Sequence, residues 1–286
     1  MANIALVTLA QSHSAPTNTK AILIELGHSV TIYESHSVVT SQLVGFDLIA
    51  WCRGAESASA SKQVADAVRA GVPLMCGTAG GTTVFNDLPI QKLGIISGTI
   101  SQLSGDPSKE SVKIMMNNNI TTGVGNVGDL VSVYNSNTYM IGVSNSQFVQ
   151  GVEFITADQV DDTRSTLAMV PKGTTNNLGE PTAASMAFIP WLYGVQGYTT
   201  NAKLMIQRLI TRLIGEVKVV SGVVTDSNGL PAQLTVIAVD LTSNYVVGVT
   251  TSDIDGSYSM SLVIAVGGSI AVLCVDEKNN PLIYVG

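Results

Sequence analysis

Charge is scarce in this sequence of 286 residues: Asp, Glu, Lys and Arg make up 12% of it, about half the usual ~25%. Basic residues are the rarer sign, with 14 Lys and Arg against 21 Asp and Glu and a net charge of −7. Binding to nucleic-acid phosphates needs a basic face, and attachment to anionic lipid needs clustered Lys and Arg. The composition therefore predicts neither a nucleic-acid nor a membrane partner. Hydrophobic residues at 45% exclude intrinsic disorder.

Cysteine and histidine are also few. Three cysteines stand far apart at positions 52, 76 and 274, which fits neither a disulfide framework nor a zinc site. Each lies in an apolar, strand-like context, so we expect buried free thiols. The three histidines are His13, His28 and His36, and none follows residue 36. We expect no bound metal and no cofactor.

Leader and membrane segments are not expected. The first residues, Met1–Val7, lack a basic region followed by an apolar stretch and a cleavage site, as a signal peptide would have. Residues 257–275 carry no charge, but Gly267-Gly268-Ser269 interrupts them. Two strands joined by a turn fit this stretch better than a membrane-spanning helix.

Strands and helices alternate in the first third of the chain. Apolar runs predict strands at 3–9, 29–34, 46–52 and 72–76, and helical spacing predicts helices at 17–28 and 59–71. Ile24 and Leu26 are expected on the buried face of the first helix. This alternation predicts an α/β fold with a doubly wound, mainly parallel sheet.

The middle of the chain is less regular. Short strands are predicted near 112–116, 130–134, 139–143, 152–155 and 166–170, then a strand and loop at 186–194. The helix with the clearest apolar stripe is predicted at 199–216.

After Glu216 no helical period remains. Short strands are predicted at 217–225, 233–240, 245–251, 257–264 and 270–275, with turn signals between them. This pattern predicts a small all-β sandwich. The domains are therefore expected at 1–216 and 217–286.

Cys76 ends an apolar strand and precedes the Gly-rich residues 77–83. A nucleophile at a sharp strand-to-helix turn is a known catalytic arrangement. A reactive cysteine needs a base, however, and no histidine follows residue 36. We therefore predict that no residue is catalytic and that Cys76 is a buried strand end. Backbone amides of the turn could bind an anion, but it has no P-loop lysine.

Three further motifs are expected to be structural. Residues 123–128 match G-x-G-x-x-G, but a strand is predicted after them where a dinucleotide site needs a helix. Residues 253–256, Asp-Ile-Asp-Gly, resemble the start of a calcium loop without its closing Glu, so we predict a hairpin turn. Asp158, Asp161 and Asp162 are predicted to form a solvated loop.

Aromatic residues are few, and the dense group is Trp191, Tyr193 and Tyr198 with Phe188. It has three open interpretations: the lining of a ligand cleft, a contact with a neighbouring subunit, or the core. Trp191, Tyr193 and Tyr198 are our candidates for interaction residues.

The Cys76-Gly77 turn and the closing stretch FIPWLYGVQGYTTNAKLMIQRLITRLIG (188–215) resemble the class I glutamine amidotransferase-like fold, in its ThuA-like branch. That family has Gly-x-Cys-x-Gly at the nucleophile, whereas Leu74-Met75 precede Cys76 here and Gly77-Thr78 follow it. The family's late His-x-Glu is absent. The resemblance implies a degenerate domain in which Cys76 is a vestigial nucleophile position.

The stretches VSGVVTD (220–226), GLPA (229–232) and TTSDIDGSY (250–258) resemble the carboxypeptidase regulatory-like, or transthyretin-like, β-sandwich. The ending AVLCVDEKNNPLIYVG (271–286) is similar to the version of this module found in bacteriophage virion proteins. There it serves in docking or display, which implies contacts with other virion proteins.

The function expected from these features is that of a non-enzymatic structural component of a bacteriophage virion, in the tail or baseplate rather than the capsid. Low charge suits a subunit packed among others, so a homo-oligomer within the particle is expected. The protein would be made in the host cytoplasm and located in the virion. Two alternatives stay open: a ThuA-like hydrolase or sugar-modifying enzyme using Cys76 or an acidic cluster, and a secreted pair of carbohydrate-binding modules.

Overall fold

The structure, a computed structural model, describes residues 1–9, 14–52, 58–77, 87–98, 100, 111–136, 141–193, 197–226, 228–241, 245–264, 269–275 and 281–283. The chain divides into two compact units, Met1–Leu209 and Ile210–Gly286. This division falls inside the last helix, ahead of the limit predicted after residue 216.

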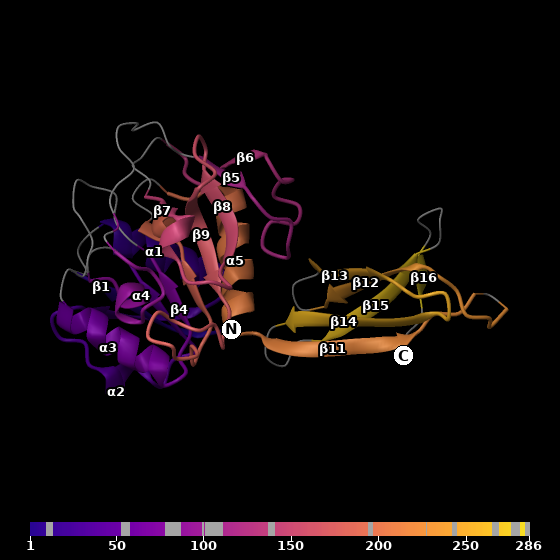
Figure 1. The fold of residues 1–286 in the computed structure, drawn as a ribbon, viewed down its shortest axis with the longest axis horizontal. Coiled ribbons are helices and arrows are strands. Elements are labelled where there is room, and N and C mark those ends of the chain that lie inside the picture. Colours follow the sequence, from indigo (N-terminus) through magenta and orange to yellow (C-terminus); the bar gives the residue numbers. More distant parts are fainter. Residues whose placement is uncertain are drawn as a thin grey trace. The chain divides into compact units, whose positions relative to one another are not determined.

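The first unit combines helices with one large sheet (Figure 1). Its elements in chain order are β1 (Asn3–Thr8), α1 (Ser14–Glu25), β2 (Ser29–Glu34), α2 (Thr40–Leu43), β3 (Leu48–Trp51), α3 (Ala58–Arg69), β4 (Leu74–Cys76), α4 (Pro89–Lys92), β5 (Ser111–Ile114), β6 (Leu130–Ser132), β7 (Val143–Ser144), η1 (Asn145–Gln147), β8 (Glu153–Asp158), β9 (Arg164–Val170), β10 (Met186–Phe188), η2 (Pro190–Tyr193) and α5 (Thr200–Ile214). The α/β class predicted from the alternation of strands and helices is confirmed.

The described strands of this unit form a ten-stranded sheet in the order β2-β1-β3-β4-β10-β9-β8-β5-β6, with β7 paired to β9. From β2 to β10 all neighbours run parallel. From β10 onward the pairs are antiparallel. The parallel half is the part foreseen from the βα alternation, and the rest is an antiparallel extension of it.

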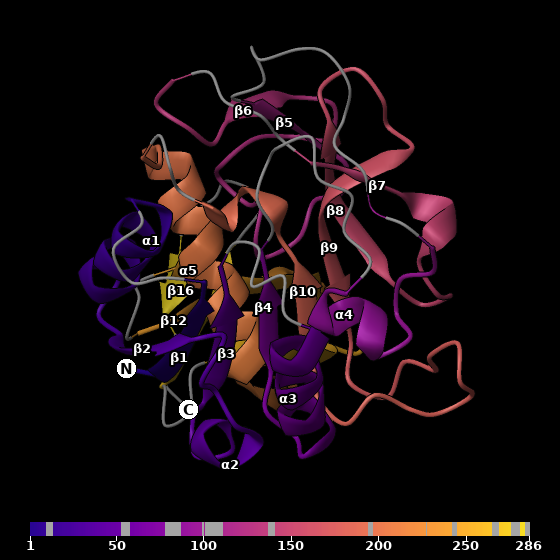
Figure 2. The same ribbon diagram turned by 90° about the vertical axis from the view of Figure 1, so that its left-hand side faces the viewer.

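Both faces of the parallel half are covered. Ile49 and Trp51 of β3 share a buried cluster with Val64 of α3. The alternate residues of the same strand, Leu48 and Ala50, are equally buried and point the other way. Figure 2 shows α1 and α5 on the side of the sheet opposite α3. The connection from β1 runs to β2 on one side, and the connection from β3 runs to β4 on the other side. Because both crossovers are right-handed, their helices α1 and α3 lie on opposite faces of the sheet.

Helix α1 buries a face different from the one expected. Ile24 is half-exposed and Leu26 lies beyond the helix end, whereas Ile22 and Leu23 are buried. Thr19, a polar residue, also lies on the buried face. A hydrogen bond rather than apolarity keeps it there, as shown below, and so the apolar spacing was misleading.

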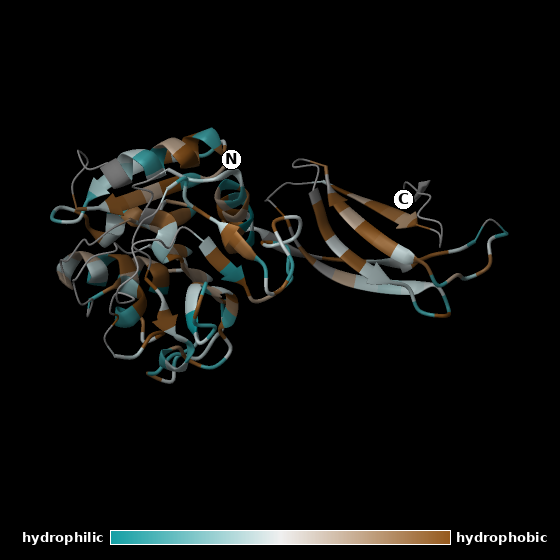
Figure 3. Cartoon of the chain, turned by 90° about the horizontal axis from the view of Figure 1, so that it is seen from above, coloured by the Kyte–Doolittle hydropathy of each residue, from teal (hydrophilic) through white to brown (hydrophobic). Residues whose placement is uncertain are grey.

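The second unit contains β11 (Glu216–Val223), β12 (Thr235–Asp240), β13 (Tyr245–Thr251), β14 (Ser257–Ile264), β15 (Ile270–Val275) and β16 (Pro281–Ile283). Among these described strands, β11 and β14 form one antiparallel sheet, and β13-β12-β15-β16 form another. Buried residues of both sheets, among them Leu262 of β14 and Val236 of β12, share one hydrophobic cluster. Figure 3 shows apolar residues along the strands of this unit and strongly hydrophilic ones in its turns.

The turn at 253–256 is present, with the Gly256 N–H donating to the Asp253 carbonyl at 2.8 Å. It is not a hairpin turn, because β13 before it pairs with β12 and β14 after it pairs with β11. The turn therefore carries the chain from one sheet to the other. The strands predicted within residues 257–275 are confirmed as β14 and β15, and no helix in the described ranges is long and apolar enough to cross a membrane.

Candidate functional site

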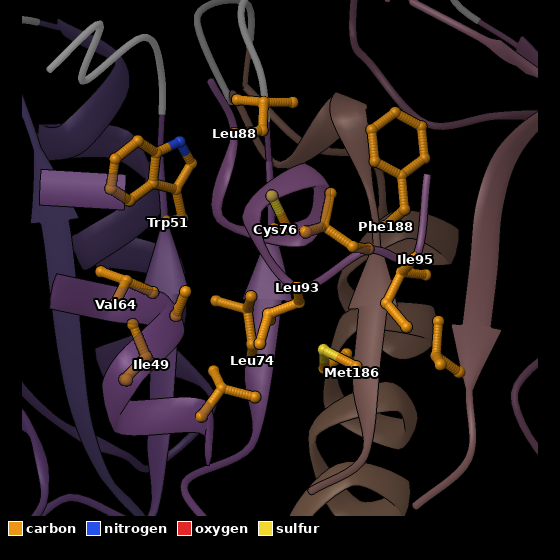
Figure 4. Packing of buried hydrophobic residues seen from close by; sticks show 14 of the residues in the cluster. Ile49, Trp51, Val64, Leu74, Cys76, Leu88, Leu93, Ile95, Met186 and Phe188 are labelled. Carbon is orange, nitrogen blue, oxygen red and sulfur yellow. The ribbon is translucent and has the colours of Figure 1, made fainter. Parts of the chain in front are cut away.

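Cys76 lies at the carboxyl end of β4, where it is fully buried. Its side chain sits in the cluster beneath α3 and α4, together with Leu88, Leu93 and Phe188 (Figure 4). The chain then passes so close to β3 that a Cβ built on Gly77 would lie 2.8 Å from the Trp51 carbonyl oxygen. Only glycine fits there without a shift of the backbone.

Burial raises the pKa of the Cys76 thiol to about 12, against a smaller opposing effect of a hydrogen bond from the Ile90 backbone. At pH 7 only about one molecule in 10⁵ would carry the thiolate. Since the thiolate is the reactive form, this side chain is not prepared for nucleophilic attack.

No histidine of the described segments is placed to act as a base for Cys76. His28 directly precedes β2, so it lies at the amino end of the parallel strands, whereas Cys76 lies at their carboxyl end. The Nδ1 atom of His28 accepts a hydrogen bond from the Ala2 backbone. His36 follows β2, three strands away from β4 or about 14 Å, and pairs with Glu34. His13 and residues 78–86 lie outside the described residues, so the anion-binding expectation for 77–83 can be followed only at Gly77.

The polar groups that do meet near this edge of the sheet converge on the carbonyl of Leu192 in η2. Thr19 Oγ1 of α1 donates to it at 2.8 Å and the Tyr198 hydroxyl at 2.5 Å. The Cys52 thiol, one residue beyond β3, approaches the same oxygen at 3.8 Å. Next to it the Tyr134 hydroxyl donates to the Trp191 carbonyl at 2.6 Å. These bonds fix η2 against α1 and β3.

All the side chains of this network are buried. Burial raises the pKa of Tyr198 well above 10, with Tyr134 and Cys52 adding to the effect, so its hydroxyl stays neutral and donates. The rings of Tyr134 and Tyr198 stack at 6.0 Å. A closed set of satisfied donors of this kind holds a backbone in place rather than presenting a reactive group.

The structure describes the side chains of two of the three aromatic residues predicted for interaction. Trp191 and Tyr198 are 1% and 4% exposed, which supports the core interpretation for both. The side chain of Tyr193 lies outside the described residues. A contact with a neighbouring subunit stays a prediction for this segment. Sequence reasoning missed Thr19, Cys52 and Tyr134, since nothing in their local sequence marks them as partners of η2.

The acidic and glycine-rich motifs have structural roles. Asp161 pairs with Arg164 and Asp162 with Lys113, both at the surface as predicted. Asp158 is 2% exposed, so the prediction of a solvated position is wrong for it. Residues 123–128 form turns that lead into the strand β6 and not into a helix, as predicted.

Comparisons with known proteins give little more. No protein-family model matches the chain, and no curated protein matches it. Among solved structures the chain is similar to PurLQS from Thermotoga maritima, at 13% identity and a TM-score of 0.44, over 73% of this chain and 97% of that one. A score this low decides neither the family of the chain nor its function.

Proposed function

We propose that this protein is a non-enzymatic structural component of a bacteriophage virion, in the tail or baseplate, that assembles with other virion proteins. In this proposal the first unit is a degenerate amidotransferase-like domain of the ThuA-like kind. The second unit is a transthyretin-like sandwich that docks to a neighbour or displays loops. The virion assignment rests on the sequence pattern of residues 220–286.

The observation that carries the non-enzymatic part is the enclosure of Cys76. The residue that a cysteine hydrolase of this resemblance would need is fully buried among apolar side chains, with its pKa raised to about 12. The acidic alternative has little support, because Asp161 and Asp162 are committed to ion pairs with Arg164 and Lys113.

The assembly part is supported by apolar side chains on the surface of the second unit. Val219, Val223 and Val249 are each more than 60% exposed, and Ile254 is 89% exposed. Single exposed apolar residues are common, but several on one small unit favour a surface that packs against other subunits.

A protein inventory of purified particles tests the proposal. Virions of the phage encoding this chain are purified by density gradient, and their proteins are quantified by mass spectrometry. We expect the chain in the particles in fixed ratio to known tail proteins, with the crude lysate as the control for expression. Presence in the lysate and absence from the particles would overturn the assignment. Glutaminase activity in the wild type that Cys76→Ser abolishes would overturn its non-enzymatic part.

A further inference from the structure

Strand β2 ends the large sheet on one side, where its single described neighbour is β1. The two strands stay in continuous register along the whole of β2, without a bulge. Natural edge strands are usually protected by a bulge, a proline or several charged side chains. β2 has the sequence Ser-Val-Thr-Ile-Tyr-Glu, so Glu34 at its end is the one charge that it carries. This regular edge is therefore open to pairing with another strand.

The free backbone groups of this edge belong to Val30 and Ile32. The N–H groups of Ser29 and Ser35 point toward β1 and donate to backbone carbonyls there at 2.9 and 2.7 Å. Since the direction alternates from one residue to the next along a strand, Thr31 also points toward β1. Val30 and Ile32 point away from β1, and their outward N–H and C=O groups have no partner within the described part of the chain.

The chain itself closes the edge beyond these two residues. The His28 N–H donates to a carbonyl of α1 at 3.0 Å. The Glu34 carbonyl accepts N–H groups of the turn after β2 at 3.0 and 3.1 Å. The open part of the edge is therefore centred on Thr31, whose side chain is exposed.

An edge of this form fits a second copy of itself. Two identical edges related by a two-fold axis run antiparallel. With the axis opposite Thr31, the Val30 N–H donates to the Ile32 carbonyl of the second copy, and the Ile32 N–H of that copy donates to the Val30 carbonyl. The symmetry repeats both bonds, so no free group is left over. With the axis opposite Ile32, the Val30 N–H would need the Glu34 carbonyl, which already accepts hydrogen bonds within its own chain.

The side chains agree with the register centred on Thr31. The two Thr31 side chains face each other across the axis, and opposed threonines stabilise antiparallel pairs. Glu34 falls opposite His28 of the second copy and not opposite its own counterpart. The single charge of the strand therefore meets no like charge across the pair.

Helix α1 adds an apolar side chain next to this edge. Figure 2 shows α1 nearer to the β2 end of the sheet than α5. Glu25 of α1 pairs with Lys203 of α5 at 2.8 Å, which identifies the flank of α1 that faces α5. Ile24 lies on the other flank and is 51% exposed. Pairing of two β2 edges brings these apolar flanks toward each other across the axis.

We propose that the β2 edge is a self-association site, at which two copies of the chain pair β2 with β2 antiparallel about an axis opposite Thr31. Their large sheets then join into one continuous sheet. The proposal gives a defined contact to the homo-oligomer expected from the low charge, and it does not depend on the virion assignment. Absence of the chain from particles would leave it standing.

Sedimentation of the full chain over a concentration series tests the contact. We expect a monomer–dimer equilibrium for the wild type. Thr31→Lys and Thr31→Glu each place two like charges across the axis, on Cβ atoms about 5 Å apart, and should weaken dimerisation about tenfold. An equimolar mixture of the two variants should restore dimerisation, because opposite charges then face each other. Val160→Lys is the matched control, since Val160 is 77% exposed in the turn after β8, and it should leave dimerisation unchanged.

Residue-resolved amide hydrogen exchange identifies the edge itself. Dimerisation should slow exchange at Val30 and Ile32, whose N–H groups point away from β1. Thr31, whose N–H points toward β1, should exchange slowly at every concentration.

A wild type that stays monomeric throughout the series would overturn the proposal, as would a dimer whose Val30 and Ile32 amides exchange as fast as those of the monomer. Undiminished dimerisation of both Thr31 variants, or a mixture that associates no more tightly than either variant alone, would show that no axis lies opposite Thr31. Equal weakening by Val160→Lys would also refute the contact, because net charge and not position would then control association.

Discussion

Replacing Cys76 and Cys52 by serine, one at a time, tests whether the carboxyl end of β4 is a sealed core position. Both thiols are fully buried: Cys76 ends β4, and Cys52 directly follows the neighbouring parallel strand β3. The Cys52 thiol lies 3.4 Å from Thr19 Oγ1 and 3.8 Å from the Leu192 carbonyl oxygen. Cys76 packs in an apolar cluster, with a hydrogen bond from the Ile90 backbone. The same change is therefore made in a polar and in an apolar setting.

The magnitudes follow from the hydrogen bonds open to each hydroxyl. A serine at 52 can donate to Thr19 Oγ1, which itself donates to the Leu192 carbonyl, so the loss in free energy of unfolding should stay below about 1 kcal/mol. A serine at 76 can accept from Ile90, but its own proton would point into apolar side chains. Burying an unpaired hydroxyl costs about 1–3 kcal/mol in proteins. We expect Cys76→Ser to be the more destabilising variant by about 1–2 kcal/mol.

Tryptophan fluorescence during urea unfolding measures this, because Trp51 and Trp191, the two tryptophans of the sequence, both lie in the first unit. The signal is therefore specific to the unit that carries both substitutions. Equal stability of the two variants, or a larger loss for Cys52→Ser, would refute the reasoning from their surroundings.

The same unfolding experiment, repeated at different pH values, tests the burial of the Cys76 thiol. The folded-state pKa of Cys76, about 12, lies above its ordinary value of 9.0. The folded state therefore holds this proton more tightly, and the resulting stability is fully present below pH 9 and lost as the pH rises toward 12. Above pH 9 the wild type should lose up to ~1.4 kcal/mol per pH unit more than Cys76→Ala, which has no thiol to ionise. Parallel pH curves for the two would contradict burial of the thiol.

Three further outcomes are expected. Gly77→Ala should lower the free energy of unfolding by about 1–3 kcal/mol, because the new Cβ would lie 2.8 Å from the Trp51 carbonyl oxygen. Gly45→Ala is the control: a Cβ there has nothing within 4 Å, so the same unfolding assay should show almost no change. Tyr198→Phe should lower the free energy of unfolding by about 0.5–1.5 kcal/mol, because the Leu192 carbonyl loses one hydrogen bond and keeps the one from Thr19; unchanged stability would show that Thr19 alone suffices. Self-association or partner binding through apolar surfaces should persist from 0.1 to 1 M salt in sedimentation experiments, and dissociation at 1 M would indicate a charge-driven interface instead.

The sequence predicts elements well where periodicity and burial agree. The strand at 29–34 is found as predicted, and the helix predicted at 59–71 is α3, with Val64 and Val68 on its buried face. The short helices α2 and α4 and the three-residue strand β16 were missed, because four residues or fewer cannot show a period. A strand of that length is defined by its neighbour and not by its own sequence.

The strands of the antiparallel half of the large sheet were predicted one by one, but their pairing, like the network around Leu192, was missed for another reason. β10 lies between β4 and β9. In the sequence, more than a hundred residues separate β10 from its partner β4. The Thr19–Leu192 hydrogen bond joins residues 173 positions apart. Local patterns carry no information on such partners. The sealed position of Cys76 was predictable, because an apolar strand leading into it implies burial.

The distribution of charge explains why the second unit is a further place to look for partners. The ion pairs that join two described residues fall within residues 25–203, in the first unit. From residue 219 to 275 the charges are four aspartates, of which Asp226 and Asp255 use their carboxylates to accept backbone N–H groups of their own turns. Those hydrogen bonds lower the pKa of both groups, so they stay ionised, but they sit at turns. The strands β13, β14, β15 and β16 carry no charged residue, and Val219 and Val223 of β11 are exposed. An uncharged face of this kind does not repel an approaching uncharged surface. It can therefore accept either a flat apolar contact or the addition of a strand.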